Sequence, residues 1–176
     1  MVRRLADEGR PATAAEQQVL ARWSSWGALP EVFESWRPEW ADVQSQVAQE
    51  LTAAEHEAAA ATTLNAHYTD PGIVRAIWDA LEEAGVTQGT VLEPGCGAGT
   101  FIGMAPEQVR MVGVELDPLT ARIASGLYPD AHIVASGFQD APLGAADAQP
   151  SPCTTRWTIR WACRSTTTSS PRRCVA

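Results

Sequence analysis

Apolar residues in the first part of this 176-residue chain recur at the spacing of helices. Residues 13–16 and 52–55 each place a threonine three positions before a glutamate, a capping box that predicts the start of a helix. Pro38 can open a further helix. The apolar residues expected on the helical stripes are Val19, Leu20, Trp23, Trp40, Val43, Val47 and Leu51. Residues 1–64 are therefore predicted to form a helical N-terminal extension.

A second pattern begins at residue 65. Thr69 or Asp70 can cap a helix, Pro71 suits its first position, and Gly85 can end it. The apolar residues predicted to share one face of this helix are Ile73, Val74, Ile77, Trp78 and Leu81.

Short apolar runs then alternate with helical spacing. Residues 90–92 predict a short buried strand, and residues 111–114 and 132–135 predict two more, with a helix over 119–127. This succession is typical of the opening of a doubly wound parallel sheet. The fold class is therefore predicted to be α/β, with residues 65–144 as the part that contains the sheet.

Charge is distributed unevenly along the chain. Residues 1–144 carry 8 arginines and 20 acidic residues, about −12, whereas residues 145–176 carry 5 arginines and one acidic residue, about +4. There is no lysine. An acidic body disfavours the binding of nucleic acid over its bulk surface.

Composition also bears on membranes and metals. No apolar run approaches the roughly 20 residues of a membrane span, and no apolar segment follows the two N-terminal arginines as in a signal peptide. We therefore expect a cytoplasmic protein with no membrane partner. No CxxC pair occurs, so neither a zinc site nor a disulfide scaffold is expected from the cysteines, Cys96, Cys153, Cys163 and Cys174.

Residues 145–176 follow neither a helical nor a strand period. They contain three of the four cysteines, two tryptophans and a run of Ser, Thr, Arg and Pro. Three interpretations remain open for this irregular tail: an interaction segment, disorder, or out-of-frame translation of a GC-rich gene, which we favour.

The tryptophans of the N-terminal extension have two interpretations. We expect them to pack the helices against the following part of the chain, because nothing nearby is basic enough to favour base stacking. They are Trp23, Trp26, Trp36 and Trp40.

The run LEPGCGAGTF at 92–101 carries the candidate chemistry. Glycines after a strand let a ligand approach backbone N–H groups with no Cβ in the way. A dinucleotide loop has the pattern G-x-G-x-x-G, but Thr100 or Ile102 stands where its last glycine would be. The loop is therefore not of the dinucleotide type.

Two acids flank this loop. Glu93 would repel a pyrophosphate but suits a cationic ligand such as S-adenosylmethionine, with its ammonium and sulfonium groups. Glu115, eighteen residues after Gly97, can accept hydrogen bonds from both hydroxyls of a ribose. The alternatives are that Glu93 only caps the following turn and that Glu115 is a solvated acid at a strand end.

Three stretches together resemble successive motifs of class I S-adenosylmethionine-dependent DNA adenine methyltransferases. They are NAHYTDP at 65–71, VLEPGCGAG at 91–99 and VGVELDP at 112–118. More narrowly, residues from about 11 to 142 resemble the N-terminal methyltransferase region of large bacterial and phage proteins. A Swi/Snf-type helicase follows that region, and some of these proteins act in antirestriction.

The resemblance implies an incomplete Rossmann-like methyltransferase fold with S-adenosyl-L-methionine as cofactor. Thr69 would contact the methionine carboxylate, and Glu115 would hold the ribose. Leu116 and Phe138 would cover the two faces of the adenine ring. The residues that would shape the methionine pocket are Glu93, Gly95, Gly97 and Gly99. Many relatives place an acid before the aromatic residue, where this chain has Gly137; Asp140 could substitute weakly.

The resemblance also exposes an absence. Amino-methylating relatives carry an [N/D/S]-P-P-[F/Y/W] loop, or N-V-P-F in the narrower group, after a fourth strand. Its polar groups accept from the target amine, and its aromatic residue stacks on the flipped base. After Leu143 the sequence has neither a fourth strand nor a loop of this kind. The segment Pro150-Ser151-Pro152 lacks both the acceptor and the aromatic ring. We therefore expect a truncated fragment without catalytic residues, inactive as this chain alone.

Partners and alternatives follow from the same comparison. DNA is the substrate of the full-length family, and a helicase region can lie in the same or a neighbouring chain. One alternative is a methyltransferase that acts on a small molecule or protein. The other is a non-catalytic remnant or interaction module of a methyltransferase–helicase protein.

The tail generates a first prediction. Residues 158–169 can be encoded so that a neighbouring frame reads DPLGMSIHNHF, which resembles the segment shortly after the catalytic loop of relatives. We hypothesise a deletion with a frameshift near residues 148–151. Translating the gene and the DNA downstream of its stop codon in all frames tests this; an uninterrupted in-frame coding history for residues 150–176 would contradict it.

Overall fold

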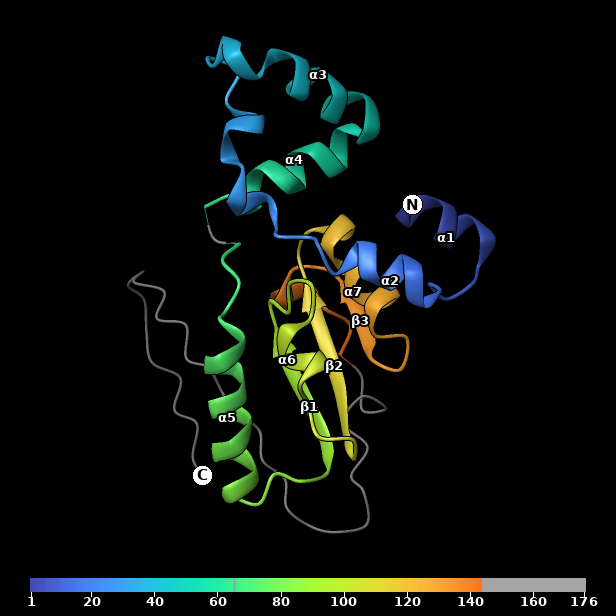
Figure 1. Ribbon diagram of the computed structural model, residues 1–176, viewed down its shortest axis with the longest axis vertical. Coiled ribbons are helices and arrows are strands. Elements are labelled where there is room, and N and C mark those ends of the chain that lie inside the picture. The colour runs from blue at the N-terminus through green and yellow to red at the C-terminus, as the bar shows by residue number, and fades with distance from the viewer. Residues whose placement is uncertain (65, 144–176) are drawn as a thin grey trace.

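The protein joins a group of N-terminal helices to a small parallel sheet (Figure 1). The structure is a computed structural model that describes residues 1–64 and 66–143. The hypotheses about the tail, including its cysteines and the frameshift, lie outside the described residues. Within these ranges, none of the helices has the length and apolar character needed to cross a membrane.

The element order follows the sequence prediction closely. The helices of the N-terminal extension are α1 (Val2–Glu8), α2 (Ala14–Leu20), α3 (Ala41–Glu50) and α4 (Ala53–Thr62), with 3-10 turns at Trp26–Ala28, Pro30–Phe33 and Pro38–Trp40. The second part contains α5 (Pro71–Glu83), β1 (Gly89–Pro94), α6 (Thr100–Gly103), β2 (Val109–Glu115), α7 (Pro118–Leu127), β3 (His132–Ala135) and a 3-10 turn at Phe138–Asp140.

Both predicted capping boxes are confirmed. Thr13 Oγ1 accepts a hydrogen bond from the Glu16 amide at 3.4 Å, and Thr52 Oγ1 accepts one from the Glu55 amide at 3.2 Å. Pro38 opens a 3-10 turn, and α3 begins only after it. No residue of α3 is buried, so its apolar stripe does not contribute to the core.

The two ends of α5 are formed as predicted. Asp70 Oδ1 accepts from an amide of the first turn at 2.8 Å, and Pro71 is the first helical residue. At the other end Gly85 has a φ of 93°, and the amide of Val86 donates to the carbonyl of Leu81 at 2.8 Å. A glycine in the left-handed region satisfies the last carbonyl groups of a helix in this way.

Only part of the predicted apolar face of α5 is buried. Val74 and Trp78 are 0% and 3% exposed and pack toward the sheet, whereas Ile73 and Ile77 are 56% and 39% exposed. The two pairs lie side by side on the helix, about 100° apart around its axis. A helix against a single sheet surface buries the narrow stripe that faces the strands, and its neighbouring apolar residues stay open.

The sheet is parallel and open, with strand order β1-β2-β3. The apolar residues of the central strand β2 are buried, as expected for parallel sheets covered on both faces. β1 lies at an edge of the described sheet, and its Leu92 is 39% exposed. Thr90 and Val91 are only partly buried, so the expectation of a buried strand at 90–92 is wrong. Within the described residues, the chain is thus an α/β protein with a three-stranded parallel sheet.

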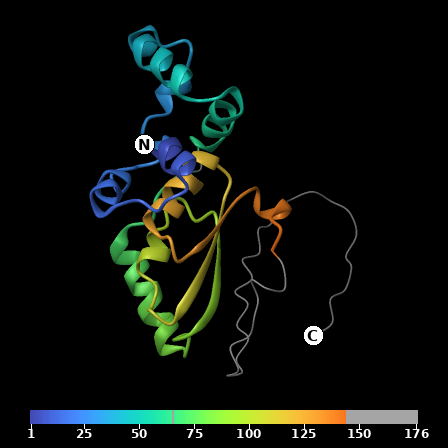
Figure 2. The same ribbon diagram turned by 90° about the vertical axis from the view of Figure 1, so that its right-hand side faces the viewer.

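Two apolar clusters hold the parts together. The cluster between α5 and the sheet contains Val74, Trp78, Cys96, Ile102, Val109 and Met111. The cluster that joins the N-terminal helices to α7 contains Leu5, Leu20 and Ile123. α1 and α2 accordingly lie beside α7 in Figure 1, and Figure 2 shows α5 along one side of the strands.

Two of the N-terminal tryptophans confirm the packing interpretation. The indole N–H of Trp23 donates to Thr120 Oγ1, and that of Trp26 donates to Asp117 Oδ2, both at 3.1 Å. Their rings also meet edge to face, with centroids 4.8 Å apart. Trp36 differs, because 73% of it is exposed.

A buried carboxylate links three helices of the two parts. Glu55 in α4 is 8% exposed and accepts from Arg3 of α1 at 2.7 Å and from Arg122 of α7. It also accepts from the backbone amide of Thr52 at 2.9 Å. That amide and the guanidinium of Arg122 hold the pKa of Glu55 at about 2.

We expect Glu55→Gln to destabilise the fold by about 1–2 kcal/mol, because glutamine keeps the capping box but loses the charge between the two arginines. The loss should be largest above about pH 5 and should disappear as the pH falls toward 2, where Glu55 itself becomes neutral. Urea unfolding at several pH values measures it. Exposed Glu57 on the same helix supplies the control, Glu57→Gln; equal effects of the two variants would contradict the prediction.

Candidate functional site

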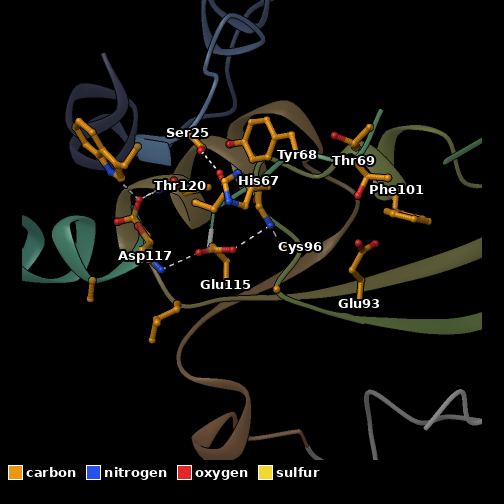
Figure 3. Close-up of a pocket in the computed structure, with 18 residues that line it drawn as sticks. Ser25, His67, Tyr68, Thr69, Glu93, Cys96, Phe101, Glu115, Asp117 and Thr120 are labelled. Carbon is orange, nitrogen blue, oxygen red and sulfur yellow. Dashed lines mark hydrogen bonds between the residues drawn. The ribbon is translucent and has the colours of Figure 1, made fainter. Parts of the chain in front are cut away.

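A cavity of about 220 Å³ opens at the carboxyl ends of β1 and β2. The glycine loop after β1, the end of β2 and residues 66–69 form most of its wall, and residues of the N-terminal extension complete it. Figure 3 shows the lining side chains around Glu115. Ligands of open parallel sheets bind outside the carboxyl ends of the strands, where the loops diverge.

The glycine loop adopts a backbone that needs glycine. Gly97 has a φ of 55°, and a Cβ there would lie 2.9 Å from the ring of Tyr68. Gly99 has a φ of 89°, and a Cβ there would lie 2.7 Å from the ring of Tyr128. Two aromatic rings thus pack directly on the loop, one on the cavity side and one on the core side. Positive φ values of this kind are readily adopted by glycine and rarely by other residues.

Glu115 is the centre of the site. Its Oε2 accepts a hydrogen bond from the Gly97 amide and its Oε1 accepts one from the Asp117 amide, both at 2.9 Å. Burial raises the pKa of Glu115, while these two amides oppose the change. A carboxylate oxygen can accept more than one hydrogen bond, so Glu115, which lines the cavity, keeps the capacity to accept from ligand hydroxyls.

Glu93 has a different environment. It lies at the other end of the cavity from Asp117 (Figure 3), and none of the described residues donates a hydrogen bond to its carboxylate. Burial raises its pKa to about 8. A half-buried carboxyl group without a partner is costly in its charged form. A cationic ligand group would supply the missing partner.

Six of the eight predicted site residues line the cavity. They are Thr69, Glu93, Gly95, Gly97, Glu115 and Leu116. Gly99 lies beneath the cavity at the start of α6, where its missing side chain makes room for Tyr128. Phe138 lies beyond β3, is 52% exposed and does not reach the cavity wall. The structure thus does not bring these two residues to the wall of the cavity.

The structure adds wall residues that the sequence did not reveal. Ser25 and Trp26 reach the cavity from the N-terminal extension, as does Thr62 at the end of α4. Ser25 has a φ of 69°, the only positive value of a non-glycine residue in the described ranges. Strained backbone of this kind often occurs at binding sites. A serine followed by a tryptophan matches no motif, so the sequence held no signal for this role.

The described residues contain no group of three or more His, Cys, Asp or Glu side chains able to hold a metal ion. Comparison with protein-family models, with curated proteins and with solved structures finds no match for this chain. The geometry of the cavity itself therefore carries the functional argument.

The raised pKa of Glu93 predicts an unusual dependence of stability on pH. The folded chain keeps a proton on Glu93 up to about pH 8, whereas the unfolded chain releases it near pH 4.3. The free energy of unfolding therefore loses a contribution as the pH rises through this interval. Without ligand, we expect Glu93→Gln to match the parent near pH 4 and to exceed it by on the order of 1–2 kcal/mol at about pH 8.5.

Urea unfolding of the ligand-free protein checks this difference. Glu83→Gln, at the exposed end of α5, is the control and should leave the pH profile of the parent unchanged. A Glu93→Gln profile parallel to that of the parent would contradict a buried, unpartnered carboxyl group at this position.

Proposed function

We propose that this chain contains the cofactor-binding part of a class I S-adenosylmethionine-dependent methyltransferase of the DNA adenine type, with an incomplete Rossmann-like sheet. The observation that carries the proposal is the pair of carboxylates at the ends of adjacent parallel strands. Glu93 is the next-to-last residue of β1 and Glu115 is the last residue of β2, with the glycine loop and one cavity between them.

The two carboxylates select the class of nucleotide. A pyrophosphate would meet two acidic side chains and no arginine or lysine, because none of the described residues that line the cavity is basic except His67. S-adenosylmethionine carries its positive charges at one end and its ribose diol in the middle. Glu93 would lie near the cationic end, and Glu115 would accept from the diol.

The other lining residues fit the same orientation. Thr69 lies on the Glu93 side of the cavity, where it would contact the methionine carboxylate (Figure 3). Leu116 follows Glu115 directly and is 54% exposed, so it offers an apolar surface to the adenine ring. Burial of Leu116 under a base would remove from water a side chain that the ligand-free protein leaves open.

The transfer step needs groups that the sequence does not supply. Residues 1–176 contain no [N/D/S]-P-P-[F/Y/W] loop to accept from an exocyclic amine. We therefore infer a chain that binds the cofactor but transfers no methyl group alone. DNA and a helicase region would be partners of a larger assembly, and the acidic surface argues against tight binding of DNA by this fragment.

Ligand binding tests the proposal. S-adenosylhomocysteine should bind and should stabilise the chain, by about 2.7 kcal/mol at a concentration of 100 times Kd. Glu115→Gln should weaken binding about tenfold or more, because charge-assisted hydrogen bonds to the diol are lost. Isothermal titration calorimetry measures both, and Glu107→Gln, at an exposed position outside the cavity, is the matched control.

The other functions give other results. Absence of binding at millimolar ligand would favour a non-catalytic remnant, and stronger binding of NADH would favour a dinucleotide protein. Methyl transfer to unmethylated DNA by the purified chain would overturn the inference of inactivity. Transfer to small molecules or proteins, but not to DNA, would favour the other methyltransferase class.

A further inference from the structure

We propose that the turn at residues 25–27 of the N-terminal extension, rather than Phe138, closes the base end of the cavity, and that Trp26 positions this turn for nucleoside binding. The inference deepens the proposed function and rests on it. Phe138 lies outside the cavity wall, so another part of the chain must cover a base placed on Leu116.

The cavity has two ends that different parts of the chain build. Figure 3 shows Thr69, Phe101 and Glu93 on one side of Glu115, and Asp117 and Thr120 on the other. Ser25 and Trp26 join the wall together with Thr120 and with residues 61 and 62 of α4. The end away from Glu93 is therefore shared between the sheet and the N-terminal extension. This is the end at which a ribose held by Glu115 would direct its base.

Ser25 fixes the turn against the segment before α5. It is 6% exposed, and its hydroxyl donates to the carbonyl of Ala66 at 2.5 Å while accepting from the Gly27 amide at 3.1 Å. A Cβ on Gly27 would lie 2.5 Å from the same carbonyl oxygen. The backbone at Gly27 thus lies too close to the Ala66 carbonyl for any larger residue to fit without movement. The two hydrogen bonds of the Ser25 hydroxyl stabilise a φ of 69° at Ser25, which a serine rarely adopts.

Trp26 fixes the other side of the turn against the sheet. Its indole N–H donates to Asp117 Oδ2 at 3.1 Å. Asp117 is 1% exposed and also caps α7 through the amides of Leu119 and Thr120. Asp117 lies two residues after Glu115 and donates its own amide to it at 2.9 Å. The tryptophan is therefore connected to the ribose acceptor through one residue.

Other aromatic rings pack against Trp26. Its ring meets Trp23 and Phe33 edge to face, with centroids 4.8 Å and 5.2 Å apart, and Phe33 meets His56 of α4 in the same way at 5.0 Å. Such pairs restrict the orientation of the ring. The chemistry of this end follows: Trp26, Leu116 and Ala61 are apolar, and the hydroxyl of Ser25 is already engaged. The wall suits a flat, weakly polar base recognised by shape.

The test compares two ligands and two tryptophans. S-adenosylhomocysteine and 5′-deoxy-5′-methylthioadenosine share the nucleoside, but only the first carries the amino acid. Trp26→Phe keeps the ring contacts and removes the donor to Asp117; it should weaken both ligands by a similar factor, about tenfold. Trp36→Phe, at the exposed tryptophan, should stay within about twofold of the parent. Glu93→Gln should weaken only the ligand with the ammonium group.

A second variant acts on the wall without touching Trp26. Gly27→Ala places a methyl group against the Ala66 carbonyl and should move the turn, again weakening both ligands alike. Hydrogen exchange provides a readout beyond affinity: either ligand should protect the amides of residues 25–27 in the parent and should do so less in Trp26→Phe. Exchange within α5 should be the same in both proteins.

Each outcome decides one question. If the parent binds neither ligand, the proposed function fails, and this inference fails with it. If the parent binds and Trp26→Phe and Gly27→Ala bind equally well, this inference alone fails. A loss of affinity in Phe138→Ala as large as that in Trp26→Phe would assign the base end to Phe138 and overturn it as well.

Discussion

The hydrogen bond from the Gly97 amide to Glu115 is the interaction on which the site depends. It joins the loop after β1 to the end of β2 and so fixes the two strand ends that face the cavity. The register of the parallel pair brings these ends side by side, and the positive φ of Gly97 aims its amide at the carboxylate. Without it, Glu115 would be a half-buried acid that keeps the Asp117 amide as a donor. The start of the loop would still be held to β2, because the amides of Gly95 and Cys96 donate to the carbonyl of Val114 at 2.7 and 2.9 Å.

This arrangement places two carboxyl groups where water is scarce. Burial raises the pKa of both Glu93 and Glu115, but within residues 1–64 and 66–143 Glu115 has two amide donors and Glu93 has none. The ligand-free protein therefore carries an unfavourable group at one end of the cavity, and a cation bound there would remove the cost. The burial of Glu93 lowers the stability of the ligand-free protein, and the same burial would strengthen its attraction for a cationic ligand. Such a trade-off between stability and binding is common at functional sites.

Local patterns made part of this structure predictable. The capping boxes, the stop at Gly85, the strand over 132–135 and the glycine loop depend on neighbouring residues, and the sequence identified each of them. The open side of α5 and the exposure of Leu92 depend instead on which elements cover a surface, which periodicity does not encode. Six of the predicted residues line one cavity, because most of them belong to motifs that lie at strand ends. Ser25 and Trp26 were not predicted to line it, because their role arises only from contacts some 40 and 90 residues away along the sequence.

The contacts of Ser25 and Trp26 with residues 66 and 117 give the N-terminal extension a second point of attachment, beside the cavity. Glu55 binds α1 and α7 by charge, whereas Trp26 and Ser25 fasten the same extension at the cavity itself. The extension is therefore attached to the second part of the chain at two separate places, through Glu55 and through the turn at 25–27. An extension that only shielded an apolar helix would need neither the strained serine nor the bond to a capping aspartate. The N-terminal extension therefore contributes Ser25, Trp26, Ala61 and Thr62 to the wall of the cavity.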